Sequence, residues 1–195
     1  FTLKNTSFKL LDNGVTVECL DAENGDFDII DGVTYTKRNR ADIIDLLAFG
    51  EEHENVSRSC TSGLTNMSEL FKNKGTFNQD ISHWDVSDVT NMSSMFNRAS
   101  SFNQNLNDWN VSNVTTMDAM FYKATYFNQD LNDWNTSSLV DMNNMFHEAT
   151  YFNGDISSWD VSKVTNMLHA FLGATIFNQD LSNWDVSSVK NMSRM

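Results

Sequence analysis

Residues 77–101 read FNQDISHWDVSDVTNMSSMFNRASS, and the same pattern recurs four more times at a spacing of 25 residues. A fixed period of about 20–50 residues indicates stacked supersecondary units, each of which buries its apolar face against its neighbours. The sequence therefore predicts a repeat architecture. The residues that keep the spacing are Phe77, Phe102, Phe127, Phe152 and Phe177, then Trp84, Trp109, Trp134, Trp159 and Trp184, and Met92, Met117, Met142, Met167 and Met192.

The spacing of the apolar residues changes within one repeat. From Ile81 through Trp84 to Val86 it is three and then two residues, as in the strand half of a leucine-rich repeat. From Val89 to Ala99 the spacing is helical. We therefore predict an α/β repeat solenoid over residues 61–195, with leucine-rich-repeat-like coils of one short parallel strand and one short helix. Its first copy is degenerate, four copies are complete and the last is cut short.

Residues 1–60 do not repeat. The terminal coil of a solenoid exposes an apolar face, so this part is expected to be an N-terminal capping segment. Short strands are predicted at residues 15–17 and 32–35. A helix over residues 41–49 should end at Gly50. The side chains expected to point inward from this helix are Ile43, Ile44, Leu47 and Phe49.

The composition argues against some partners. The formal net charge is −13 and the pI is near 4.4, so the chain should repel the phosphate backbone of nucleic acids. No apolar run reaches the roughly 18–20 residues that span a bilayer, so no membrane insertion is expected. The first ten residues lack a signal-peptide pattern. If the protein is exported, its signal was removed or lies outside this sequence.

Two cysteines, Cys19 and Cys60, flank the region before the repeats. Neither belongs to a C-x-x-C motif or to a Cys/His cluster, so metal or redox chemistry is not supported. A structural disulfide is the favoured interpretation, and two free buried thiols are the alternative. A disulfide would imply an oxidising, extracytoplasmic compartment.

The repeated aromatic and polar residues have structural explanations. A large residue at one place in every coil suits a stacked core, so we predict that the tryptophan and methionine rows are buried. The Asn and Asp rows, such as those beginning at Asn78, Asp80 and Asp85, are expected to close turns on the backbone. Calcium binding through their oxygen atoms is the alternative.

No catalytic motif is present. The four histidines occupy non-equivalent positions, and the chain has no G-x-S-x-G, P-loop or H-E-x-x-H motif. We therefore expect a protein that is not an enzyme and that has no catalytic residues, cofactor or metal site. The N-x-S/T sequons leave glycosylation open.

The pattern FNQDIS-x-WDVS-x-VTNMS-x-MF, with its 25-residue period, closely resembles the BspA-type leucine-rich-repeat surface proteins. The resemblance covers about residues 61–195. It implies export, an extracellular or cell-surface location, and a role in adhesion or protein–protein interaction. Val89 stands where the general leucine-rich template has a ladder-forming Asn, so the curvature of that template is not expected.

Positions that differ between copies, on a fixed core, are the candidates for a binding face. We predict that Tyr122, Tyr126 and Tyr151 form one exposed stripe; the alternative is that these rings pack on the next coil. The expected partner is a protein or glycan at a cell surface or matrix, or export machinery that handles a secreted cargo. The alternative function is a structural spacer or passenger region of a larger exported protein. The partner-binding candidates are Tyr122, Tyr126, His147, Tyr151 and Ile176.

Overall fold

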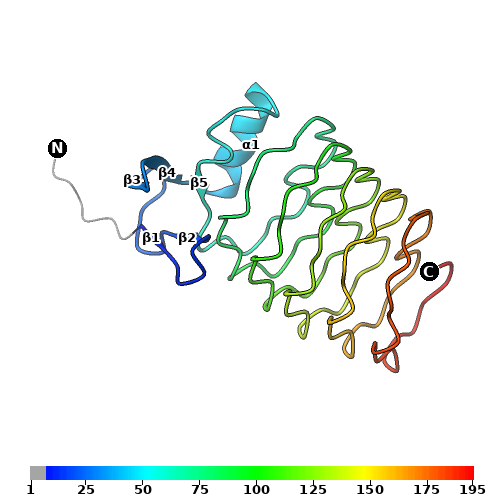
Figure 1. Cartoon of the computed structure of the whole chain (residues 1–195). Helices are drawn as coiled ribbons and strands as arrows, with labels where there is room; N and C mark the ends of the chain where they lie inside the picture. The colour runs from blue at the N-terminus through cyan, green and yellow to red at the C-terminus, as the bar shows by residue number, and fades with distance from the viewer. Residues whose placement is uncertain (1–7) are drawn as a thin grey trace, which may run out of the picture.

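The computed structural model describes residues 8–195 and shows two kinds of structure (Figure 1). Regular secondary structure lies in the N-terminal region, and the loops of the repeats follow it to the C-terminus. The elements in chain order are β1 (Lys9–Leu10), β2 (Val17–Glu18), β3 (Phe27–Ile30), β4 (Val33–Lys37), α1 (Arg40–Phe49) and β5 (Ser59–Cys60).

The strands form two small sheets. β1 pairs antiparallel with β2, and the second sheet has the order β3–β4–β5. Asp31 and Gly32 join β3 to β4 with φ angles of 50° and 81°, the left-handed backbone that a tight hairpin turn requires. β5 runs parallel to β4, with Ser59 opposite Thr36. The strands predicted near residues 15–17 and 32–35 are therefore present as β2 and β4.

α1 confirms the helix predicted over residues 41–49. Its N-terminus is closed by a capping box, in which the Asn39 side chain accepts from the Asp42 amide and the Asp42 carboxylate accepts from the Asn39 amide. Gly50 follows its last residue as the C-cap. The apolar spacing and Gly50 were sufficient to predict the helix from the sequence, and the capping box is a further local signal that the prediction did not use.

α1 lies against the first repeat through a narrow face. Ile43 and Leu47, one turn apart, are buried in the core that continues into the repeats. Ile44 and Phe49, which were predicted to point inward as well, are 40% and 83% exposed. That part of the prediction is wrong, because the first repeat covers only one stripe of the helix.

The disulfide between Cys19 and Cys60 is present, as predicted, and links residues 41 apart in the sequence. Both cysteines are buried in a small second core beside Val17. The Val17 amide donates to the carbonyl of His83 at 2.9 Å, and Val17 forms a parallel bridge with Trp84. The N-terminal region is therefore joined to the first complete repeat through its backbone.

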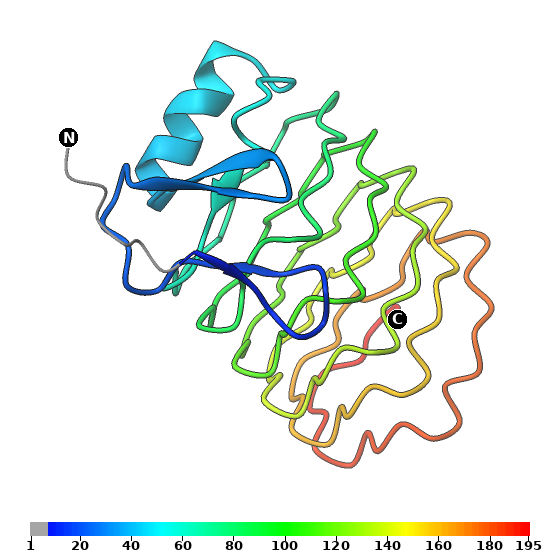
Figure 2. The same cartoon turned by 60° about the vertical axis from the view of Figure 1, so that its left-hand side comes forward.

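Successive repeats lie side by side in register (Figure 2). This confirms the 25-residue period and the parallel direction of the contacts between repeats. Parallel bridges join residues one period apart, from Asn66 through Asn91, Thr116, Asp141 and Asn166 to Asn191.

The helix predicted in each repeat is absent from the described residues. The backbone of residues 92–99 instead alternates between two kinds of hydrogen bond. The Met95 amide donates to the Met92 carbonyl and closes a tight turn, whereas the Ser94 amide donates to the Asp118 carbonyl of the next repeat at 2.7 Å. The same alternation recurs in the later repeats. Each repeat therefore satisfies its polar backbone partly through its neighbour.

Left-handed residues explain why no helix forms there. In the first complete repeat they are Ser94 and Arg98, with φ angles of 57° and 61°. A left-handed residue ends a right-handed helix, and it costs a non-glycine residue about 1 kcal/mol. The equivalent pairs are Glu69 and Asn73, Ala119 and Lys123, Asn144 and Glu148, and His169 and Gly173.

The strand predicted at residues 81–86 is also absent. The Trp84 amide donates to the Ile81 carbonyl, and the Val89 amide donates to the Val86 carbonyl. These apolar residues therefore lie at the corners of tight turns, and their spacing of three and two residues comes from the corners rather than from an extended chain.

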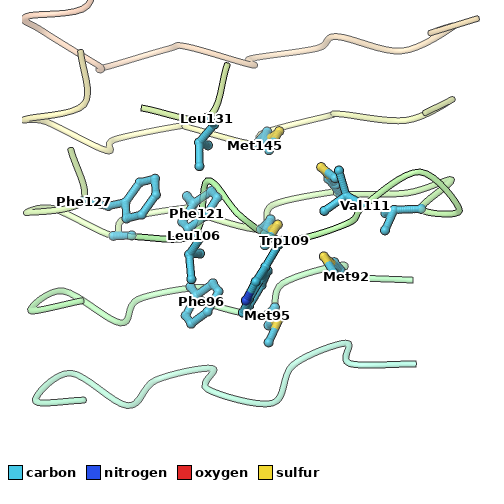
Figure 3. Close-up of a cluster of buried hydrophobic side chains, with 14 of the residues drawn as sticks. Met92, Met95, Phe96, Leu106, Trp109, Val111, Phe121, Phe127, Leu131 and Met145 are labelled. Carbon is cyan, nitrogen blue, oxygen red and sulfur yellow. The ribbon is translucent and has the colours of Figure 1, made fainter. Parts of the chain in front are cut away.

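The core contains rows of stacked aromatic rings together with methionine, leucine and valine side chains (Figure 3). Phe96 stacks on Phe121 of the next repeat with ring centroids 5.5 Å apart, and Phe121 stacks on Phe127, which begins the following repeat, at 4.0 Å. Trp134 and Trp159 stack at 5.8 Å. The predicted burial of the tryptophan row is confirmed, and that of the methionine row is confirmed except at Met192. Four indoles donate to a carbonyl of the preceding repeat: Trp109, Trp134, Trp159 and Trp184.

Candidate functional site

All five candidate residues lie in the turn segments that contain the left-handed residues. We call residues 69–76, 94–101, 119–126, 144–151 and 169–176 the turn edge. Backbone bonds hold these segments against one another: the Arg98 amide donates to the Tyr122 carbonyl at 2.7 Å, and the Lys123 amide donates to the His147 carbonyl at 2.8 Å. Side chains at equivalent positions therefore form rows along the turn edge.

One row of the turn edge is exposed and apolar. Tyr126 and Tyr151 stack with centroids 5.4 Å apart and ring planes within 5° of each other. Ile176 continues the row one period later. The three residues are 58%, 48% and 47% exposed. In the earlier repeats the same position holds the small polar residues Thr76 and Ser101.

A second row contains Tyr122 and His147. Their rings meet edge to face at 5.0 Å, and His147 meets His169 of the following repeat at 5.5 Å. The Nδ1 atom of His147 lies 3.2 Å from the Oδ1 atom of Asn144. Tyr122 and His147 are half-buried, so this second row is less exposed to solvent than the row of Tyr126 and Tyr151.

Charged side chains border the second row. The Lys123 ammonium lies 5.3 Å from the centroid of the Tyr122 ring, and the Arg98 guanidinium lies 5.9 Å from it. Such contacts stabilise a cation by about 0.5–1 kcal/mol at exposed sites. Lys123 also pairs with Glu148 at 3.3 Å, and Glu148 lies 3.5 Å from Nε2 of His147.

The pKa of His147 is lowered from its ordinary value. Partial burial is the main cause, because it disfavours the charged imidazolium; the neighbouring His169 and Lys123 act in the same direction. Glu148 opposes them. His147 is therefore held toward its neutral form at neutral pH.

The predicted single stripe becomes two rows. Tyr126 and Tyr151 are adjacent and exposed, but Tyr122 pairs with His147 rather than joining them. The prediction of one stripe assumed a helix in each repeat, and residues 119–126 form turns instead. The sequence analysis also missed His169, which lies on the row of Asn144 rather than that of His147. Only the left-handed backbone brings these two rows together.

The Asp85 row and four of the five residues of the Asp80 row close turns, as predicted, whereas Asp130 accepts from the amide of Asp155 in the next repeat at 2.9 Å. Asp80 accepts from the amide of Ser82 at 2.9 Å, which is an Asx turn. Among residues 8–195, no group of three or more His, Cys, Asp or Glu side chains is placed to hold a metal ion. The Asp85 row makes the same contact with the amide two residues later at Asp85, Asn110, Asn135, Asp160 and Asp185.

The Asn78 row behaves differently from the prediction. Its side chains bridge repeats instead of closing local turns, because the Asn78 Oδ1 atom accepts from the amide of Asn103 at 2.9 Å. Four such bonds form an asparagine ladder along the return loops. The acceptors are Asn78, Asn103, Asn128 and Asn153.

Clefts lie where the N-terminal region meets the repeats, and two of them are away from the candidates. One, of about 450 Å³, lies between the β1–β2 hairpin and the first repeats and is lined in part by Lys9 and Asp108. The other, of about 460 Å³, contains Tyr35 and His83, whose rings are 5.0 Å apart. Burial lowers the pKa of His83.

The region that contains the repeats also matches a known protein family. A family model matches residues 46–150 and, in a second overlapping match, residues 129–195. The chain belongs to the DUF285 family. That family is described as "Mycoplasma protein of unknown function, DUF285", so membership in DUF285 brings no activity with it. No curated protein and no solved structure matches the chain.

Within the described part of the chain, no helix combines the length and the apolar character needed to cross a membrane.

Proposed function

We propose that this protein is a non-catalytic adhesion or protein-interaction module of a cell surface or a secreted protein. The repeats would form a solenoid of the leucine-rich-repeat-like, BspA-type kind, and the turn edge would carry the binding residues. The expected partner is a protein or glycan at a cell surface or matrix.

The observation that carries this proposal is the contrast between core and turn edge. The ladder residues keep their identity through the array and are buried, as at Phe121 and Trp134. On the turn edge, one position changes from Ser101 to Tyr126, Tyr151 and Ile176, and the amides of the first three donate to equivalent carbonyls of the preceding repeat. Exposure of apolar side chains to water is unfavourable, and large aromatic anchors ringed by polar groups are typical of binding surfaces.

The Cys19–Cys60 disulfide supports a location outside the cytoplasm. Disulfides persist in oxidising compartments and are rare in reducing ones. The resemblance to BspA-type surface proteins points the same way. A secreted or surface-exposed module is consistent with both observations.

The test is a binding panel with a matched variant. The full chain is immobilised and exposed to purified matrix proteins, surface proteins and glycans. The edge variant carries Tyr126→Ser, Tyr151→Ser and Ile176→Ser, because Ser101 already occupies the same row and the backbone accepts serine there. Thermal unfolding of both proteins checks that the variant is folded.

We expect at least one partner that binds the wild type and not the edge variant. If a folded edge variant binds the partner as well as the wild type does, the exposed row of the turn edge is not the binding surface. The absence of any partner across the panel would contradict the adhesion proposal and favour a structural spacer in a larger exported protein.

A further inference from the structure

The charges of the repeat array are separated by row. After residue 60 the chain has fourteen acidic and seven basic residues, yet the turn edge holds two of the acidic and four of the basic ones. Because the repeats stack in register, this separation in sequence becomes a separation on the surface. The turn edge is therefore a basic strip on a protein of net charge −13. Its acidic residues are Glu69 and Glu148, and its basic residues are Lys72, Lys74, Arg98 and Lys123.

Two of these basic residues are engaged at the N-terminal end of the strip. Lys72 pairs with Glu69 at 2.5 Å, and Lys74 donates to the Leu47 carbonyl at the end of α1. The Asp118 side chain, which borders the strip, is half-buried and accepts from Asn143 at 2.9 Å. In the middle of the strip, Lys123 is paired with Glu148, and Arg98 is the cation left to meet a ligand.

Arg98 and Lys123 occupy the same row in adjacent repeats and flank the same tyrosine ring, Tyr122. Like charges on neighbouring repeats repel each other. Glu148 offsets Lys123, but Arg98 has no ion pair among residues 8–195 and is exposed. A carboxylate placed between the two cations would relieve the repulsion.

The ring geometry of the neighbouring row argues for a peptide over a sugar. Tyr126 and Tyr151 are parallel within 5° and stacked along the array. The face that each ring turns to the other is covered, so the surface that the pair shares consists of ring edges and hydroxyl groups. A sugar that stacks needs a free ring face, whereas protein side chains pack against edges and hydroxyls.

We propose that the turn edge binds an acidic segment of a partner protein. Carboxylates of the segment lie at Arg98 and Lys123, and an apolar side chain of the segment packs beside Tyr126 and Tyr151. The acidic remainder of the array repels such a segment and steers it to the strip. This inference rests on the proposed function and names the class of its partner.

The experiment uses the full chain and three probes, measured by fluorescence anisotropy. They are a labelled peptide in which Glu alternates with Leu, its counterpart in which Lys alternates with Leu, and a heparin oligosaccharide as the sulfated-glycan alternative. The strip variant carries Arg98→Glu and Lys123→Glu. Glu148 holds the equivalent position with a φ of 56°, so the backbone accepts glutamate there.

The control variant carries Lys163→Glu and Lys190→Glu, two exposed basic residues outside the turn edge. It has the same net charge as the strip variant. We expect the wild type and the control to bind the Glu/Leu peptide within about twofold of each other. The strip variant should bind it about tenfold more weakly, and binding should weaken as salt is added. The Lys/Leu peptide should not bind the strip.

Three results would overturn the inference: no binding of the Glu/Leu peptide, equal loss in strip and control variants, or tighter binding of heparin through Arg98 and Lys123. The partner panel separates this failure from failure of the proposed function. If a panel partner binds the strip variant but not the edge variant, the proposal of an acidic segment is wrong. The proposal of an adhesion module would still be supported.

Discussion

The N-terminal region and the repeat array hold their chains together in different ways. The N-terminal region has strands, one helix and a disulfide. The array has none of these in its described residues and relies on stacked rings and on backbone bonds to the next repeat. The difference arises because an inner repeat packs against a similar repeat on both sides. The N-terminal region instead covers the apolar face at one end of the array.

The indole nitrogen of the repeated tryptophan has a different environment at the boundary between the two regions. The indole of Trp109 donates to the Ile81 carbonyl of the repeat before it. Trp84, at the same position of the first complete repeat, has a buried indole nitrogen with no partner among residues 8–195. Phe71 of the degenerate copy packs against the Trp84 ring, but Val56, which is equivalent to Ile81, lies in the N-terminal region and does not accept from the indole. Each repeat thus depends on the one before it for more than apolar contact.

The largest effect is expected from Trp134→Ala. The substitution removes the stack on Trp159 and the hydrogen bond to the Leu106 carbonyl at 2.8 Å, and it leaves a cavity in the middle of the ladder. We expect a loss of about 3–5 kcal/mol in the free energy of unfolding, measured by urea denaturation. Phe49→Ala is the control, because that ring is 83% exposed on α1, and it should cost less than about 0.5 kcal/mol. Similar costs for both would mean that the ladder is not the stabilising element.

Reduction of Cys19–Cys60 should act on one region only. Opening a loop that spans 41 residues should cost about 2–4 kcal/mol, chiefly by freeing the unfolded chain. Hydrogen exchange should therefore accelerate in residues 8–60 before it changes in the central repeats. Equal acceleration in the repeats around Trp134 would show that the N-terminal region and the array unfold as one unit.

A smaller effect is expected from Gly154→Ala. The other repeats hold glutamine at this position, but a Cβ atom on Gly154 would lie 2.0 Å from the carbonyl oxygen of Gln129. The backbones of these two repeats must separate to admit it, at a cost of about 1–3 kcal/mol in unfolding free energy. Gly75→Ser is the matched control, since its nearest neighbour, the Ser100 hydroxyl, is 3.5 Å away. A neutral Gly154→Ala variant would show that stacked repeats slide more freely than the ladder implies.

The period, the buried tryptophans, α1 and the disulfide could all be predicted from residues that act locally or recur. The helix in each repeat could not. Met92, Met95 and Phe96 have helical spacing, and consecutive tight turns produce the same spacing. Glycines would have revealed the left-handed positions, but Ser94 and Arg98 occupy them in the first complete repeat.

The candidate site shows the same limit. Sequence variation between copies led to Tyr126 and Tyr151, which are adjacent and exposed. It did not predict the pairing of Tyr122 with His147 or the contact with His169, because both depend on the path of the turns. The separation of basic and acidic rows was visible in the sequence once the register of stacking was known.

The smallest effect is expected from acidification, and it should fall on the boundary between the two regions. The His83 ring packs against Tyr35 of β4 at 5.0 Å, and burial lowers the pKa of His83 below its ordinary value of 6.5, with Asp80 opposing the shift. The folded state therefore favours neutral His83, and the unfolded state takes up a proton first as the pH falls. Stability from this group is full above pH 6.5 and is lost as the pH falls from there through the lower pKa of the folded protein.

The urea midpoint of the wild type should therefore decrease between about pH 7.5 and about pH 5.5. The decrease should be smaller in the variant His83→Asn. Asparagine is chosen because Asn183 holds the equivalent position in the last repeat. A smaller slope from His147 should remain in that variant, because its pKa is also lowered by burial. If the urea midpoint of His83→Asn depends on pH as strongly as that of the wild type, protonation of His83 does not cause the loss of stability. The acid-sensitive groups would then lie within the array.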